Sequence, residues 1–150
     1  MMGPRQVIRQ LADLDRTATF DLLRAAAELL IARARLPRLT TAELIKLRAD
    51  GEALPPSATI DRVSFAIPRV AARMPWRSDC LVQALAAQRW LAAYKIPTSL
   101  VLGVRKDGGT FAAHAWLKAG EHVVTGGDIS RYQPVEPKEI GAWRTAPRTS

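Results

Sequence analysis

Apolar residues recur every three or four positions between residues 20 and 31, with polar and charged residues between them. This spacing predicts an amphipathic helix, because side chains three and four positions apart share one face of a helix. Asp15 or Thr19 is the expected cap at the start of this helix, and Pro37 is expected to stop it just after Leu36. The first part of the chain is therefore predicted to be helical.

Two shorter helical patterns follow. Thr40, with Glu43 three positions later, is typical of a capping box and predicts a second helix that runs through Leu47. Residues 61–74 again carry apolar side chains at helical spacing. Pro68 lies inside this third pattern, and we expect a kink or a late start there.

A more apolar segment begins near Ser78, which is a typical N-cap residue, and Asp79 suits the positive end of a helix. The predicted helix runs from Asp79 to about Tyr94 and is apolar on several faces, which indicates burial. Apolar runs separated by glycine turns then predict three antiparallel strands, at residues 99–105, 111–118 and 122–125. Helices, one central helix and an antiparallel sheet make an α+β fold.

Composition narrows the function. The chain has 150 residues, 48% of them hydrophobic, which fits a single domain with its own core. One cysteine and two histidines are too few for a disulfide or a cysteine-rich zinc site, so we expect no metal and no cofactor. The net charge of +8 is spread along the chain, and only 6% of residues are aromatic. These features favour a basic surface over nucleic-acid binding and leave attraction of an acidic peptide open.

No apolar stretch is long enough to span a bilayer, and no secretory signal is recognisable at the start. We therefore expect a cytoplasmic protein without a membrane partner.

Cys80 is the only cysteine and lies in the first turn of the predicted central helix. The unpaired N–H groups and the dipole of a helix N-terminus stabilise a thiolate, and a backbone N–H there can bind the oxyanion of an acyl-transfer reaction. A free cysteine is more often a small buried apolar residue. Position alone therefore leaves Cys80 open between a nucleophile and a core residue.

His114 lies in an apolar strand, and alternation places it on the same face as Trp116. A sheet packed on the Cys80 helix could bring His114 within reach as a general base. The alternative is a buried histidine satisfied by a backbone carbonyl. Asp128 is the only aspartate after His114, and a hairpin would bring it back to orient the ring. The alternative for residues 126–128 is a plain turn.

Three segments resemble one known family: residues 75–81 (Pro-Trp-Arg-Ser-Asp-Cys-Leu), residues 103–105 (Gly-Val-Arg) and residues 113–117 (Ala-His-Ala-Trp-Leu). They are similar to the transglutaminase-like leader peptidase of lasso-peptide biosynthesis, the peptidase half of the lasso-peptide B protein. The resemblance covers residues 66–134, and the cysteine and His-Ala-Trp blocks are specific in combination.

The resemblance implies a papain/transglutaminase-like fold in which the central helix carries the nucleophile, Cys80. The antiparallel sheet carries the base, His114, and Asp128 matches the third member of the triad by order and approximate spacing. Trp76, four residues before Cys80, could donate its indole N–H to the oxyanion, although a packed aromatic is the more common use of such a residue.

By the same resemblance, the chain would cleave the leader–core bond of a lasso-peptide precursor. Its partners would be that precursor, a separate leader-recognition protein and an ATP-dependent macrolactam synthetase. Two alternatives stay open: an acyltransferase that uses an amine acceptor in place of water, and a non-catalytic peptide-binding module. We expect one domain over residues 1–150, with its parts at residues 1–60 (helical lead-in), 66–134 (catalytic core) and 142–150 (loose tail).

Overall fold

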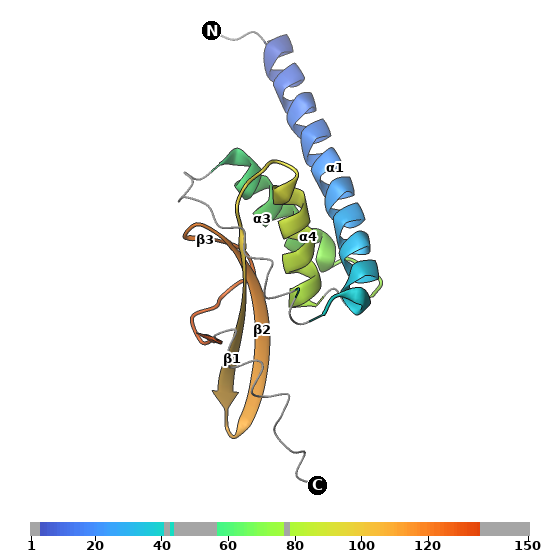
Figure 1. Cartoon of the computed structure of the whole chain (residues 1–150). Coiled ribbons are helices and arrows are strands. Elements are labelled where there is room, and N and C mark those ends of the chain that lie inside the picture. The colour runs from blue at the N-terminus through green and yellow to red at the C-terminus, as the bar shows by residue number, and fades with distance from the viewer. Residues whose placement is uncertain (1–3, 41–42, 44–56, 77–78, 136–150) are drawn as a thin grey trace.

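The computed structural model describes residues 4–40, 43, 57–76 and 79–135, with the side chains of the first helix described from Arg16 onward. Its fold is α+β, with a layer of helices against one face of an antiparallel sheet (Figure 1). The elements in chain order are α1 (Pro4–Arg35), η1 (Leu36–Arg38), α3 (Ala58–Ala71), α4 (Cys80–Ala92), β1 (Ser99–Asp107), β2 (Thr110–Ala119), β3 (His122–Thr125) and β4 (Gln133–Pro134).

The first helix is longer than its apolar spacing predicts. It begins at Pro4, so the expected caps Asp15 and Thr19 both lie inside it and the prediction of its start is wrong. Proline suits the first position of a helix, because its missing N–H would be unpaired there and its fixed φ is helical. The end is as predicted, since α1 stops at Arg35 and Pro37 stands in the short 3-10 turn that follows.

The capping box at Thr40 is confirmed by hydrogen bonds in both directions. The backbone N–H of Thr40 donates to Glu43 Oε2 at 2.8 Å, and the N–H of Glu43 donates to Thr40 Oγ1 at 3.3 Å. The remainder of the predicted second helix, through Leu47, lies outside the described residues, as does the expected tail at residues 142–150.

α3 begins earlier than expected, because Ser57 caps it by accepting the N–H of Ile60 at 3.2 Å. Pro68 lies inside this helix, which begins at Ala58, so the expectation of a late start at this proline is wrong. α4 begins at Cys80 with Asp79 as its N-cap, and the predicted cap Ser78 lies outside the described residues. None of the helices in the described part of the chain combines the length and apolar character that crossing a membrane requires.

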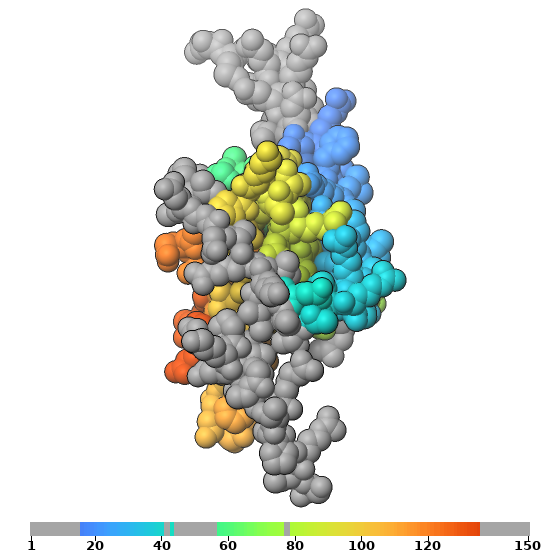
Figure 2. Space-filling model, viewed as in Figure 1, coloured from blue at the N-terminus to red at the C-terminus, as the bar shows by residue number. Residues whose placement is uncertain are grey.

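Small residues let the three long helices approach one another closely. Alanines of each helix are completely buried at their contacts, as are Leu29 of α1, Ile67 of α3 and Trp90 of α4. α4 is the central member of this layer, since it packs against α1 and α3 and also against β1, β2 and β3 of the sheet. In Figure 2 its side chains lie beside those of α1, with the β1–β2 hairpin extending past both.

Two nearly buried carboxylates fasten α1 to its neighbours. Asp21 accepts the Nε–H of Arg62 on α3 at 2.8 Å, and Glu28 accepts the Nε–H of Arg89 on α4 at 2.8 Å. Because each carboxylate has an arginine partner, burial does not leave a charge unpaired. α4, which begins with Cys80, is thus held by both apolar packing and charge.

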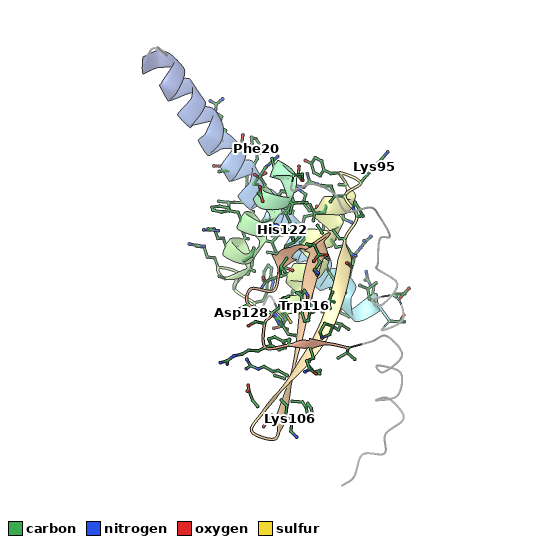
Figure 3. The ribbon with its side chains drawn as sticks, turned by 90° about the vertical axis from the view of Figure 1, so that its left-hand side faces the viewer. Phe20, Lys95, Lys106, Trp116, His122 and Asp128 are labelled. Carbon is green, nitrogen blue, oxygen red and sulfur yellow. The ribbon has the colours of Figure 1, made fainter. Side chains whose placement is uncertain are left out.

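The sheet has four strands in the order β3-β2-β1-β4, where we expected three. The fourth is the pair Gln133–Pro134, which joins β1 opposite Gly103 and Val104. Such a short strand carries no period-two pattern, so it leaves no signal in the sequence. β3 and β4 lie at opposite edges, and the connection between them therefore crosses the sheet; Figure 3 shows it in front of the hairpin.

The two faces of the β1–β2 hairpin have different surroundings. Leu100 and Leu117 are opposite each other in the ladder, and both pack with the helices. His114 lies opposite Gly103 and alternates with Leu117, so it belongs to the other face together with Trp116. The connection from β3 to β4 lies over that second face, through Tyr132.

Candidate functional site

Cys80 is the first residue of α4 and is half-buried. The helix begins there because Asp79 is extended, with φ −63° and ψ 161°, and its carbonyl accepts the N–H of Gln83 at 3.1 Å. The side chain of Asp79 makes no capping hydrogen bond. Asp79 therefore leaves the backbone N–H groups of the first turn uncapped by its own side chain, and such N–H groups beside a thiol can bind an anion.

His114 is half-buried on β2, and its Nε2 lies 2.7 Å from the carbonyl oxygen of Gly126. A carbonyl oxygen only accepts hydrogen bonds, so Nε2 carries the proton in this pair. In the neutral ring Nδ1 is then the unprotonated nitrogen. The geometry therefore assigns Nδ1 as the atom of His114 that can take a proton from a nucleophile.

Aromatic rings surround the histidine on its face of the sheet. The ring centroid of Tyr132 lies 4.7 Å from that of His114, and the centroid of Trp116 lies 6.0 Å away. Trp116 is buried, and it covers Gly103 so closely that a Cβ at Gly103 would overlap its ring. The contact between His114 and Trp116 confirms the prediction that both share one face.

Asp128 lies in the connection from β3 to β4, but its side chain bonds to Ser130 and not to His114. Its Oδ1 accepts the backbone N–H of Ser130 at 3.0 Å, and the residue is exposed to solvent (Figure 3). Hydrogen bonds from Ser130, first from its side chain and then from its backbone, hold the pKa of Asp128 below its ordinary value. Asp128 thus closes a small turn two residues after the carbonyl that contacts His114.

Cys80 and His114 come from two elements that pack against each other, α4 and β2. Among the described residues, no hydrogen bond joins the two side chains, and His114 makes its one hydrogen bond to Gly126. Leu117 packs against the helices, and His114 lies on the opposite face of β2. A contact between His114 and Cys80 therefore has to form at the N-terminal end of α4, and not along the side of the helix that packs on the sheet.

Trp76 lies against the end of α1, where the guanidinium of Arg33 is 5.9 Å from its ring centroid. Its indole Nε1 is buried and has no hydrogen-bond partner in the described part of the chain. No group of three or more histidine, cysteine or acidic side chains among the described residues is placed to hold a metal ion.

Sequence reasoning missed Gly126 and Tyr132, the residues nearest to the histidine ring. The signal available was the pair Gly126-Gly127, which ends the third strand and which we interpreted only as a turn. Both glycines have positive φ, 117° and 63°, in a region that other residues rarely adopt. Tyr132 had no signal, because its contact with His114 depends on where the connection crosses the sheet.

Residues 23–137 match the Transglutaminase-like superfamily, and the chain belongs to that family. The matched range includes all four strands and both α3 and α4, so it covers the elements that carry Cys80, His114 and Asp128. The α+β architecture is consistent with a transglutaminase-like fold, which serves cysteine peptidases and acyltransferases. Comparison with curated proteins and with solved structures gives no match.

Proposed function

We propose that this chain is a cysteine peptidase that removes the leader peptide from a lasso-peptide precursor. Cys80 is the proposed nucleophile and His114 the proposed base, and Asp128 is proposed to act only through the position of the histidine. The observation that carries the chemistry is the bond between His114 Nε2 and the Gly126 carbonyl, since it leaves Nδ1 as a base. The substrate class rests on the resemblance of the residues around Cys80 and His114 to the lasso-peptide leader peptidases.

In the proposed reaction, Nδ1 of His114 takes the proton of the Cys80 thiol, and the thiolate attacks the scissile carbonyl. The backbone N–H groups at the start of α4 are available to the oxyanion, and the indole N–H of Trp76 is a weaker candidate donor. The C–N bond then breaks, and His114 returns the proton to the leaving amine of the core peptide. Water hydrolyses the thioester, which frees the leader as a carboxylate and regenerates the thiol.

Cleavage of a cognate precursor tests this proposal. The purified chain is incubated with the precursor, and the products are weighed by mass spectrometry in the presence and absence of a primary amine. Hydrolysis gives a leader with a free carboxylate and a core with a free N-terminal amine. An amine-linked leader as the main product would assign the chain to the acyltransferases, and an intact precursor under all conditions would contradict both activities.

The proposal also requires the Cys80 sulfur to approach His114 Nδ1. A short bifunctional alkylating reagent, which reacts first with a nucleophilic thiol, should then bridge the two side chains. Digestion and mass spectrometry should recover a peptide that links Cys80 to His114. Alkylation confined to Cys80 would mean that the histidine does not serve this thiol, and His122 is the internal control for non-specific reaction.

A separate leader-recognition protein is the proposed partner, with the macrolactam synthetase acting on the released amine. The outer strands are short, with four residues in β3 and two in β4, so neither of them offers a long run of main-chain hydrogen bonds for strand addition. A protein that holds the leader would raise the effective concentration of the scissile bond at Cys80.

The partner is tested by the cleavage rate at precursor concentrations well below saturation, measured with and without the recognition protein. We expect slow cleavage by the chain alone and much faster cleavage in the mixture. Equal rates would show that this chain holds the leader by itself.

A further inference from the structure

We propose that the main-chain carbonyl of Gly126, and not the carboxylate of Asp128, orients His114, and that Asp128 acts only by closing the turn that positions this carbonyl. The inference rests on the proposed function for its catalytic meaning. Gly126 and Asp128 are positioning residues in this scheme, because neither touches the reacting atoms.

The register of the sheet explains why the carboxylate is not the partner. Leu117 pairs with Thr125, so an extension of β3 by three residues would set Asp128 directly opposite His114. Cross-strand partners share a face, and the two side chains would then meet. The chain leaves this path at Gly126 and Gly127, whose positive φ values turn it away from the strand.

Because of this turn, the acceptor that faces His114 is the backbone carbonyl of Gly126 and not the side chain of Asp128. A Cβ at Gly126 would overlap the Cβ of Trp116 and would lie 3.4 Å from His114 Nε2. Glycine is therefore required both by φ and by the close approach to Trp116. The same approach sets the carbonyl oxygen at 2.7 Å from the ring nitrogen, which is a well-formed hydrogen bond.

A carbonyl at this position can fix the histidine through the whole reaction. Nε2 carries a proton in both the neutral ring and the imidazolium, so the bond to Gly126 persists while Nδ1 gains and loses its proton. Selection of the tautomer and orientation of the ring are the roles that a third group performs for a catalytic histidine. The Gly126 carbonyl can perform both without a charge.

Asp128 reaches the histidine through the backbone. Its bond to the Ser130 N–H closes an Asx turn between Gly126 and Tyr132, two residues of this connection that contact the histidine ring. An asparagine can make the same bond through its amide oxygen, whereas an alanine cannot. This difference separates a turn-closing residue from a catalytic carboxylate.

The histidine itself can be observed without any substrate. The chain has two histidines, so a protein labelled with ¹⁵N-histidine gives two imidazole spin systems, and a His122→Gln variant assigns them. In the neutral ring, we expect His114 to be the tautomer protonated at Nε2 in the wild type and in Asp128→Asn. In Asp128→Ala we expect loss of this fixed tautomer. A His114 protonated at Nδ1 in the wild type would overturn the proposal.

Precursor cleavage supplies the second measurement on the same matched pair. We expect Asp128→Asn to keep kcat close to that of the wild type, and Asp128→Ala to lose about tenfold, with asparagine thus rescuing the alanine defect. An equal and large loss in both variants would assign the role to the carboxylate and overturn the proposal. Full activity in both variants would show that Asp128 does not position the histidine, and this result would overturn the proposal as well.

The two measurements fail independently. If no precursor is cleaved by the wild type, the peptidase function fails, while the ¹⁵N spectra still decide whether Gly126 holds His114. If cleavage is normal and the histidine is protonated at Nδ1, the function stands and the positioning scheme fails.

Discussion

The two halves of the proposed site are held by different kinds of structure. Cys80 starts a helix whose residues Val82, Ala84 and Ala86 are buried among α1, α3 and the sheet. His114 is held on the outer face by one hydrogen bond, which its Nε2 donates to a loop carbonyl, and by contacts with the rings of Tyr132 and Trp116. A buried residue has many close-packed neighbours, whereas a loop contact can open locally at small cost. The position of the proposed nucleophile therefore depends on the core, whereas the position of the proposed base depends on a turn.

Removal of the nucleophile should have the largest effect. We expect Cys80→Ala to lower precursor cleavage by at least about 10³-fold, because no other group in the proposed mechanism can form the acyl intermediate. Its unfolding transition should stay near that of the wild type, since the thiol is only half-buried. A folded Cys80→Ala protein that cleaves normally would end the peptidase proposal.

Removal of the base should come next. His114→Ala should lower cleavage by about 10²–10⁴-fold, the usual contribution of a positioned general base. The matched control is His122→Ala, because His122 begins β3 at the edge of the sheet and is not part of the proposed site. Equal losses in the two variants would indicate a structural effect of histidine removal and not general base catalysis.

A change in the core should separate stability from chemistry. Ala86 is completely buried on α4, and Ala86→Leu should lower the free energy of unfolding by about 1–3 kcal/mol through overpacking. Urea denaturation measures this change, and Ala92→Leu, at an exposed position of the same helix, is the control. The rate of precursor cleavage per folded molecule of Ala86→Leu should stay near that of the wild type. If Ala92→Leu destabilised the protein as much as Ala86→Leu, the burial assigned to this helix would be wrong.

The predictability of the site follows the same division. Pro75, Asp79 and the apolar run after Cys80 are local signals, and they placed the start of α4 within one residue. The strand pattern placed β3 at its observed bounds and placed His114 beside Trp116. Periodicity reports which face a side chain takes within its own element.

The features that could not be predicted from the sequence depend on contacts between residues far apart in the chain. The direction that the chain takes after Gly126 depends on two positive φ values, and a pair of glycines permits several turns. The pairing of β4 with β1 and the contact of Tyr132 with His114 both depend on that direction. The extension of α1 back to Pro4 was missed for another reason. Asp15 and Thr19 were interpreted as caps, but polar residues also occur inside a helix and do not by themselves mark its start.

The smallest effect should come from the ring that covers His114. Aromatic pairs contribute about 0.5–1.5 kcal/mol beyond their buried area, so loss of the stack in Tyr132→Leu should lower kcat by about 3–10-fold if the contact holds the reactive orientation. Tyr132→Phe keeps the ring and should behave as the wild type. The free energy of unfolding should change little in either variant, because Tyr132 is half-buried in a loop outside the helical core. This pattern, activity lost without stability, is the reverse of that expected for Ala86→Leu. Parallel losses of activity and stability in Tyr132→Leu would show that the connection belongs to the same cooperative unit as the core, and the distinction between the two halves of the site would fail.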